Sequence, residues 1–515
     1  MKSSDSKHPH PSRAATEQRD WAATARALAA IVLSGVLIGL AAPGVGHYPA
    51  LAWLAFAPWL ASLRGLRPGA AWWSGAAMGL AYTVPGRWRA FAAAVGTAGY
   101  DDWQQAALTV LLFLCYALPF AVFGVLDAIW RGRRGGAPPA ILRAGVLASL
   151  IGGLWSPFPF TPVAIVVDAT PMLQLGAFGG EPLLLFLLLW PSAAIAGLMH
   201  SPRPLSRRPI ELVPVAAVLL AVAVFGVWRL GALDRAEAAG SGARVAALPL
   251  QLDLPSSVSP AMLIGDHIGS TNSALEITRA ALARSPQCEI VVWPETPLPP
   301  DRSERVCAQA PSLARSLGRP LLMQCFRRDA EQLQVTAEWT TPTGNARWHG
   351  KSSLVPFYEQ PIFGAGQFIP GEAGTVFALD DARRLIPALC YEMHSRAHLR
   401  SAVFAGGNVI VHMASFTPFS RYPIDVWDMA MSRLRAIEFG VPIVRAVNRG
   451  PAGWIDAAGR VRQTSARFGR GGDCVEVWSP AASPTVYAYI SPFAAWLPGL
   501  LVLALTLRRA VPPTL

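Results

Sequence analysis

Long apolar runs crowd the first half of the chain, and they constrain its fold more than any other feature. A helix needs roughly 17 to 25 residues to cross a bilayer. Only 15% of the 515 residues are charged, against about 25% in an ordinary soluble protein. The chain is therefore expected to be a polytopic membrane protein. Eight spans are predicted: Ala27–Ala42, Tyr48–Leu63, Ala70–Val84, Ala106–Trp130, Ile141–Val167, Pro182–Met199, Leu212–Leu230 and Pro492–Leu507.

The distribution of arginine and lysine predicts how these spans are oriented. Basic residues cluster before the first span and after the second, fourth, sixth and last, whereas the alternate loops are nearly free of them. Positive residues are retained on the cytoplasmic side of a membrane, so both termini are expected there. Residues 1–26 are expected to form a cytoplasmic tail without fixed structure, and residues 27–232 a bundle of about seven helices. The same dispersal argues against nucleic-acid binding, despite a formal net charge of +12.

Between the last two spans, residues 240–490 have the composition of a globular domain that faces outward, and a closing span follows at 492–508. Short β-branched runs alternate there with amphipathic stretches, which predicts a layered α/β architecture. Asp425, Trp427 and Asp428 are expected on the exposed face of a helix. The predicted strands are Arg244–Leu250, Glu289–Trp293, Pro320–Phe326, Arg384–Leu389, Asn408–Met413 and Pro442–Val447, and the predicted helices are Asn272–Arg284, Ser395–Ala405 and Asp425–Phe439.

Five of the six cysteines fall in the outward-facing domain, and Cys115 lies in a span. An oxidising compartment would permit one or two disulfides among the five, with at least one cysteine left over. The sequence has no Cys-x-x-Cys pair and no Cys/His spacing typical of metal sites. We therefore predict neither a metal nor another cofactor.

Three segments of the domain carry residues suited to covalent chemistry: Val291–Glu295, Gly350–Glu359 and Ile386–Glu392. The last is an apolar strand that delivers Cys390 to a predicted strand-to-helix turn, where the helix N-terminus favours the thiolate. A carboxylate such as Glu295 can take a thiol proton, and the ammonium of Lys351 can stabilise the oxyanion of a tetrahedral intermediate. Together the three residue types suffice for acyl transfer.

These motifs resemble the Glu-Lys-Cys signature of the nitrilase superfamily, in the form found in bacterial apolipoprotein N-acyltransferases. The matching segments are Trp293–Glu295, Lys351 with Leu354–Phe357 and Glu359, Cys390–Glu392, Arg433–Glu438 and Arg445–Gly450. The resemblance implies a polytopic α-helical membrane bundle plus an α/β nitrilase-like domain, an α-β-β-α sandwich. It also implies a bacterial inner-membrane protein with its catalytic domain in the periplasm.

Carried over to this sequence, the resemblance makes Glu295 the general base, Lys351 the oxyanion stabiliser and Cys390 the nucleophile. Glu359 occupies the place of a second essential carboxylate, and Tyr391 and Glu392 match the residues after the family's cysteine. The implied reaction moves an acyl chain from a phospholipid to Cys390 as a thioester. The α-amine of a diacylglyceryl-cysteine at a lipoprotein N-terminus then accepts the chain.

One departure leaves other functions open. Where the family usually has Ser-Asn-Asp-x-Trp-Phe, this chain reads Ala414-Ser415-Phe416-Thr417-Pro418-Phe419. A membrane-tethered nitrilase-like amidase or acyltransferase with a different acceptor, of the kind associated with conjugation systems, is one alternative. A transport or assembly protein with an inert domain is the other. The loop Pro356–Phe368 is interpreted either as a lid that dips into the bilayer or as an ordered loop packed on the domain.

Overall fold

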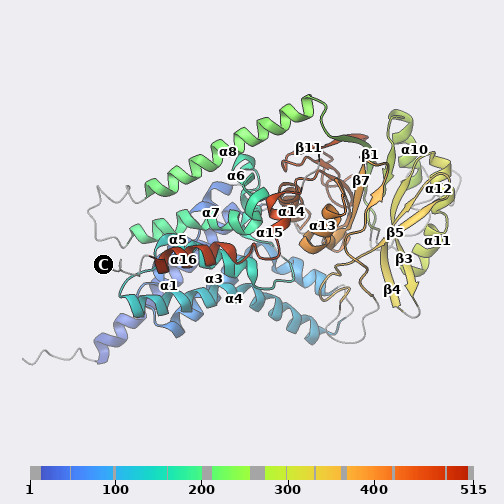
Figure 1. The fold of residues 1–515 in the computed structure, drawn as a ribbon. Coiled ribbons are helices and arrows are strands. Elements are labelled where there is room, and N and C mark those ends of the chain that lie inside the picture. Colours follow the sequence, from blue (N-terminus) through green and yellow to red (C-terminus); the bar gives the residue numbers. More distant parts are fainter. Residues whose placement is uncertain are drawn as a thin grey trace, which may run out of the picture.

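A helical bundle and an α/β domain lie end to end in the computed structural model (Figure 1). The structure describes residues 13–508, apart from positions 44, 47, 97–99, 159, 200–211, 256–272, 297–298, 330–331, 361–367, 420–423 and 482–483. The chain builds the bundle first, then the α/β domain, and returns to the bundle with its last helix. The domain is therefore tethered to the bundle at both of its ends.

Four described helices of the bundle are long and apolar enough to cross a membrane: Thr24–Ala41 within α1, and α4, α7 and α8. The predicted segment Tyr48–Leu63 instead holds two helices of 5 and 6 residues. Within Ile141–Val167, α5 has 14 residues and a length of about 21 Å. Prolines begin the next helix in both places and account for the breaks. The helices are α1 (Arg13–Ala41), η1 (Pro49–Trp53), α2 (Ala57–Ser62), α3 (Pro68–Gly96), α4 (Asp102–Arg134), α5 (Ala140–Gly153), η2 (Pro162–Val166), α6 (Thr170–Leu173), α7 (Gly176–Leu198), α8 (Val213–Ala238) and α16 (Leu497–Arg508).

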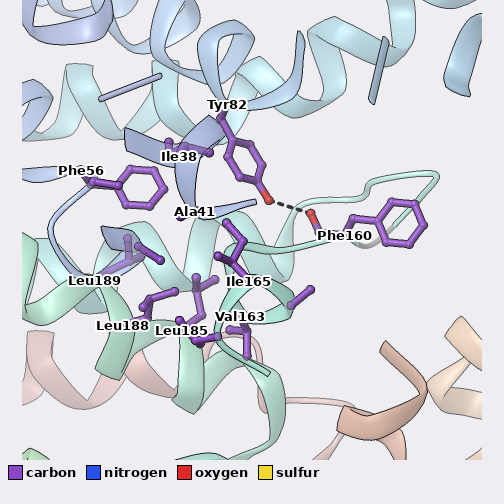
Figure 2. Packing of buried hydrophobic residues seen from close by; sticks show 14 of the residues in the cluster. Ile38, Ala41, Phe56, Tyr82, Phe160, Val163, Ile165, Leu185, Leu188 and Leu189 are labelled. Carbon is purple, nitrogen blue, oxygen red and sulfur yellow. Dashed lines mark hydrogen bonds between the residues drawn. The ribbon is translucent and has the colours of Figure 1, made fainter. Parts of the chain in front are cut away.

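Apolar side chains fill the centre of the bundle. Figure 2 shows Ile38, Phe56 and Leu188 converging from α1, the start of α2 and α7. The hydroxyl of Tyr82 on α3 donates a hydrogen bond of 2.8 Å to the carbonyl of Phe160. This bond holds Phe160, which is one of the bundle residues that contact the α/β domain.

The α/β domain is organised around a 13-stranded sheet with the order β5-β4-β3-β2-β1-β9-β8-β7-β6. Strand β1 joins two halves, because its middle residues pair in parallel with β2 and its last two residues pair in parallel with β9. All six predicted strands are present. The strands are β1 (Ala243–Leu252), β2 (Ile290–Val292), β3 (Leu321–Asp329), β4 (Gln332–Thr340), β5 (Ala346–Gly350), β6 (Phe377–Ala378), β7 (Arg384–Leu389), β8 (Val409–Ser415), β9 (Ile443–Asn448), β10 (Gly453–Ile455), β11 (Val461–Thr464), β12 (Gly471–Gly472) and β13 (Val475–Ser479).

The two sheet halves face each other and are covered by helices on the outside. Alternate strand residues such as Val245, Val292 and Val411 form the core between the halves, as expected for strands buried on both faces. One outer layer consists of α10, α11 and α12, and the other of α13 and α14. The expected α-β-β-α sandwich is confirmed. The helices are α10 (Ala274–Arg284), α11 (Pro300–Cys307), α12 (Ala310–Leu317), η4 (Cys390–His394), α13 (Arg396–Phe404), η5 (Thr417–Phe419), α14 (Ile424–Phe439) and α15 (Val486–Ile490).

Helix α14 corrects one prediction from the sequence. Asp425, Trp427 and Asp428 are buried, not exposed. One side of α14 packs on the sheet and another packs on the bundle, so the helix has little surface left for water. Its acidic residues are paired with arginines, Asp425 with Arg467 at 2.7 Å and Asp428 with Arg445 at 2.8 Å.

A buried ion cluster fastens the bundle to the domain. Glu181 on α7 accepts hydrogen bonds from Arg396 at 2.7 Å and from Arg435 at 3.2 Å. Its backbone N–H donates to Glu438 at 2.7 Å, and Glu438 also pairs with Arg435. The neighbouring Gly180 has φ 64°, and a Cβ there would lie 2.1 Å from the ring of Tyr487. A side chain at position 180 would therefore separate the two parts of the molecule.

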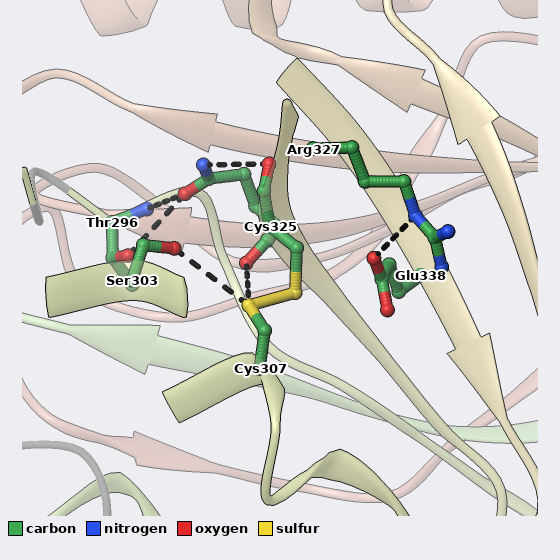
Figure 3. Close-up of a disulfide and its surroundings, with 7 residues drawn as sticks. Thr296, Ser303, Cys307, Cys325, Arg327 and Glu338 are labelled. Atoms are coloured by element: carbon green, nitrogen blue, oxygen red, sulfur yellow. Dashed lines mark hydrogen bonds and ion pairs between the residues drawn. A yellow bond between two sulfur atoms is a disulfide. The ribbon is translucent and has the colours of Figure 1, made fainter. Parts of the chain in front are cut away.

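Two disulfides tie the half of the domain that is farther from the bundle. Cys288 pairs with Cys474, and Cys307 at the end of α11 pairs with Cys325 on β3. Figure 3 shows the second bridge, with Ser303 lying beside the sulfur of Cys307. Cys115 and Cys390 remain free. The leftover cysteine of the domain is thus the one that the motifs single out.

Candidate active site

Residues from three strand ends meet at the candidate site. Glu295 lies just beyond β2, Lys351 follows β5, and Cys390 follows β7. The ammonium of Lys351 lies 3.8 Å from Oε1 of Glu295 and 2.7 Å from Oε1 of Glu359. The thiol of Cys390 lies near enough to Glu295 to act on the pKa of that carboxyl group. The structure therefore brings these four predicted residues together, although they are far apart in the sequence.

Cys390 has an unusual backbone conformation. Its φ is 46°, in the left-handed region that residues with a Cβ seldom adopt. The residue stands where β7 ends and the short 3-10 helix η4 begins, so the chain turns sharply at the sulfur. Such conformations persist only where the surroundings enforce them, and they concentrate at functional sites.

The charges around the sulfur favour a neutral thiol at rest. Burial raises the pKa of Cys390 well above its ordinary value, and the carboxylate of Glu295 raises it further, against the opposing effect of Lys351. The sequence-based expectation that a helix N-terminus favours the thiolate is therefore wrong for the resting protein. The 3-10 helix that begins at Cys390 has only 5 residues, and burial is the largest influence on the pKa of the thiol.

The pKa values of Glu295 and Lys351 are both raised, which suits them to act beside this thiol. Burial raises the pKa of Glu295, with Glu359 adding to the effect, while Lys351 and the hydrogen bond from Cys390 act to lower it. Burial also acts to lower the pKa of Lys351, but Glu359 and Glu295 outweigh it and the net pKa is raised. The lysine therefore stays charged, and Glu295 is a carboxylate that is poised to gain a proton.

Glu359 and Tyr391 support the site from opposite sides. Besides its bond to Lys351, Glu359 accepts a 2.7 Å hydrogen bond from the backbone N–H of Val355, which fixes the carboxylate. The hydroxyl of Tyr391 donates to the carbonyl of Pro157 in the bundle, and its ring meets Phe158 edge-on at 6.0 Å. Glu359 thus holds the lysine, and Tyr391 attaches the site to the bundle.

Glu392 is turned away from this group of charges and holds two backbone segments. It accepts hydrogen bonds from the N–H of Ser352 at 2.6 Å, from the N–H of Leu389 at 3.0 Å and from Nε2 of His349 at 3.0 Å. Burial acts to raise the pKa of Glu392, but His398, His349 and these hydrogen bonds lower it to about 2. It therefore stays ionised and locks the loop after Lys351 to the turn at Cys390.

His349, Glu392 and His398 also form a group whose ligand atoms lie within 4.8 Å of one another, close enough to hold a metal ion. The atoms of His398 are already engaged, since Nε2 donates to the carbonyl of Pro387 at 2.8 Å and Nδ1 accepts from Gly374 at 3.4 Å. The oxygens of Glu392 are occupied as well. The contacts fit a hydrogen-bonded support better than a metal centre, and no sequence spacing could have revealed it.

An apolar pocket lies beside Cys390, where the domain meets the bundle. Phe158 and Phe160 line it from the bundle, and Phe416 and Phe419 line it from the domain. The two domain residues belong to the segment Ala414–Phe419 that departs from the family pattern. The described start of the neighbouring loop is packed rather than extended, because Phe357 is buried against α4; positions 361–367, in the rest of the predicted lid, lie outside the described residues.

Comparisons with known proteins agree with this architecture. The carbon-nitrogen hydrolase family matches residues 265–470. Apolipoprotein N-acyltransferase from Geobacter metallireducens is 27% identical, over 85% of this chain and 86% of its own length. The enzyme of that name from Azotobacter vinelandii is also 27% identical, over 95% of this chain and 96% of its own. The resemblance to the apolipoprotein N-acyltransferases is confirmed.

Solved structures that match part of this chain include an amidase of the nitrilase superfamily from Nesterenkonia AN1. It is 18% identical, with a TM-score of 0.38, and covers 48% of this chain and 94% of its own. A carbon-nitrogen hydrolase from Helicobacter pylori is 15% identical, with a TM-score of 0.38. The nitrilase-like domain with an apolar helical region, as expected from the motifs, is confirmed by the family match, and the names of the relatives support an enzymatic function.

Proposed function

We propose that this chain transfers an acyl chain from a phospholipid, through a thioester on Cys390, to the N-terminal amine of a lipoprotein. One observation carries the proposal. A free, partly buried thiol lies beside a carboxyl group of raised pKa and a buried ammonium, and an apolar pocket opens next to it. The name of the relatives, apolipoprotein N-acyltransferase, supports acyl transfer to an apolipoprotein amine.

The first half-reaction loads the enzyme. Glu295 takes the proton of the Cys390 thiol as the sulfur attacks the ester carbonyl of the phospholipid. The oxyanion that forms is stabilised by the ammonium of Lys351. When the intermediate collapses, the carbon–oxygen bond to the lysophospholipid breaks, and its alkoxide recovers the proton from Glu295. The acyl chain stays on the sulfur as a thioester.

The second half-reaction passes the chain on. The lipoprotein amine attacks the thioester carbonyl and gives a proton to Glu295. Lys351 again stabilises the oxyanion, the carbon–sulfur bond breaks, and Glu295 returns the proton to the sulfur of Cys390. An amide is formed and the free thiol is restored, so the cycle needs no cofactor.

Both substrates are anchored in a bilayer, which gives the fused bundle its role. The pocket beside Cys390 is bounded by Phe158 and Phe160 of the bundle, so a chain lying in the membrane can reach the sulfur without crossing water. We place the protein in a bacterial inner membrane, with the domain in the periplasm and both termini in the cytoplasm. Two disulfides in the domain suit that oxidising compartment.

A second candidate keeps the chemistry and changes the acceptor. Phe416 and Phe419 line the pocket, yet they belong to the segment that departs from the family's usual residues. An altered wall at this place favours an acceptor other than diacylglyceryl-cysteine, as in a nitrilase-like transferase with another amine substrate.

The test separates loading from transfer. The purified protein is incubated with a phospholipid that carries a labelled acyl chain, and the thioester on Cys390 is measured by mass spectrometry and by its release with hydroxylamine. Cys390→Ala should abolish the label, and Cys115→Ser, which removes the other free cysteine, should keep it. A label that survives in Cys390→Ala would overturn the proposal. Transfer to a diacylglyceryl peptide then distinguishes the two acceptors, since loading without that transfer supports the second candidate.

A further inference from the structure

His412 lies beneath the nucleophile and has no place in the chemistry described above. It stands in the middle of β8, in register with Ala388 on β7 and with Arg445 on β9. Its side chain is fully buried, and its Nε2 lies 3.2 Å from the carbonyl oxygen of Cys390. The contact is to the backbone of Cys390, at the residue whose φ is 46°.

The neighbours of His412 determine which ring nitrogen carries the proton. Nδ1 lies 3.0 Å from Nη1 of Arg445, and a guanidinium only donates, so Nδ1 must accept. Burial lowers the pKa of His412 to about 4, which leaves the ring neutral near pH 7. The one ring proton is therefore on Nε2, and it is donated to the carbonyl of Cys390.

Arg445 is itself held in place, so the tautomer of His412 does not drift. Its Nη1 lies 2.8 Å from Asp428 and donates a 2.5 Å hydrogen bond to Ser432. The carboxylate of Asp428 is 3.9 Å from Nδ1 of His412, which is beyond hydrogen-bonding distance. Arg445, and not Asp428, therefore determines the tautomer of the His412 imidazole.

This contact acts on the strained residue of the site. The left-handed region is disfavoured for a residue with a Cβ, because the Cβ crowds the following carbonyl oxygen, so something must hold Cys390 there. A buried donor aimed at its carbonyl favours the conformation in which the carbonyl points into β8 and the sulfur points toward Glu295. Without that donor, the peptide is free to rotate and the thiol loses its place beside the carboxylate.

We infer that His412 is a positioning residue for the nucleophile: its Nε2–H, oriented by Arg445, holds the carbonyl of Cys390 and thereby keeps the thiol against Glu295. The inference concerns the placement of the sulfur. It holds for acyl transfer to any acceptor and for any other reaction that begins at Cys390.

Glutamine and asparagine, the two residues with amide side chains, provide a matched pair of variants at position 412. The amide of glutamine reaches the position of Nε2 and can donate to the carbonyl of Cys390, whereas the shorter asparagine reaches only the position of Nδ1. The full-length protein in detergent is treated with iodoacetamide, and the alkylation rates of Cys390 and of Cys115 are read from their peptides. Cys115 lies in α4 of the bundle and serves as the reference within the same molecule.

His412→Gln should keep the ratio of the Cys390 rate to the Cys115 rate within about threefold of the native value. His412→Asn should lower it by about tenfold or more, since a thiol that has moved away from Glu295 loses the carboxylate that takes its proton. The thermal unfolding temperature is measured alongside, so that a variant that unfolds is recognised. Equal ratios in the two variants, or a rise in His412→Asn, would overturn the inference.

A double-mutant cycle between His412 and Glu295 adds a second measurement, the effect of Glu295→Gln on the alkylation rate. General loosening of the fold would not change this effect. Glu295→Gln should slow the alkylation of Cys390 in the native and His412→Gln backgrounds, and should have little further effect in His412→Asn, where the thiol has left the carboxylate. An equal effect in all three backgrounds would contradict the inference. If this pattern holds but no acyl thioester forms, the proposed function fails and the positioning role stands.

Discussion

Two of the groups of buried charges in the described part of the chain differ in the balance of acids and bases. The cluster between bundle and domain contains two acids, Glu181 and Glu438, and two bases, Arg396 and Arg435. The cluster at the site contains Glu295 and Glu359 with Lys351 as its only base. Buried charges tend to be paired, because an unpaired one loses its hydration without compensation. The interface cluster obeys that rule and the site does not.

The geometry shows which carboxylate at the site is left over. Lys351 lies 2.7 Å from Glu359, and the distance to Glu295 is 3.8 Å. The lysine is therefore committed to Glu359, and Glu295 keeps a raised pKa. Each acid of the balanced cluster is paired with a base, so that cluster does not favour binding a further proton. The site has one carboxylate in excess, and this carboxylate can accept a proton from the thiol. In the proposed mechanism, this imbalance of charge is what suits the site to proton transfer, whereas the balanced cluster suits a structural role.

The largest expected effect comes from removing the surplus carboxylate. Glu295→Gln should slow formation of the Cys390 thioester by about 10² to 10⁴-fold, the usual contribution of a general base. The thermal unfolding temperature should stay the same or rise, because the variant removes a buried charge that lacks a full partner. Thioester formation at the native rate would contradict the assignment of the base, and a large fall in unfolding temperature would contradict the comparison.

At the interface between bundle and domain, the expected effect is on stability and not on thioester formation. Glu181→Gln leaves Arg396 and Arg435 facing Glu438 alone, and breaking one side of a buried ion cluster costs about 3 to 5 kcal/mol. The unfolding temperature should fall clearly, while thioester formation per folded molecule should remain near native. Comparing the two variants in the same detergent gives the control. A stable Glu181→Gln with lost activity would show that this cluster takes part in the chemistry.

Local patterns in the sequence predicted the parts of the site that single segments carry. An apolar strand followed by a functional residue identified Glu295 and Cys390, and a motif identified Lys351 and Glu359. All six predicted strands are present, because short runs of β-branched and apolar residues indicate a strand within a few positions of the sequence. The sandwich followed from alternating strands and helices together with the resemblance.

Contacts between distant segments could not be predicted in this way. Nothing around His412 in the sequence indicates that it faces the carbonyl of Cys390, because that depends on the register of β7 and β8. Asp428 was predicted to be exposed because a single helix pattern cannot show that two layers enclose it. The disulfide partners, 186 and 18 residues apart, follow equally from tertiary structure.

A third acid, Glu392, tests whether two histidines and backbone hydrogen bonds can replace an arginine or lysine partner in this comparison. Glu392 has a pKa of about 2 against an ordinary 4.5, so the unfolded chain binds its proton more readily than the folded protein. The contribution of Glu392 to the free energy of unfolding is therefore present above about pH 4.5 and is lost as the pH falls toward 2. At neutral pH, Glu392→Gln should lower stability by about 3 kcal/mol, from 1.36 kcal/mol per pKa unit.

The measurement compares unfolding temperatures of the native protein and Glu392→Gln between pH 7 and pH 3. The gap between them should narrow as the pH falls, because protonation makes the native carboxyl resemble the amide. A gap that is constant with pH would mean that the charge of Glu392 contributes nothing, and that only its shape and hydrogen bonds matter.

The smallest effect is expected where bundle and domain meet beside the sulfur. There the attachment is a neutral hydrogen bond from Tyr391 to the carbonyl of Pro157. Tyr391→Phe keeps the ring against Phe158 and removes only the hydroxyl, which should cost about 1 kcal/mol. The fall in unfolding temperature should therefore be well below that of Glu181→Gln. A fall of equal size would mean that the bundle is held as firmly at the reactive end of the contact as at the balanced cluster. The pocket beside Cys390 would then have to admit an acyl chain without parting the two bodies.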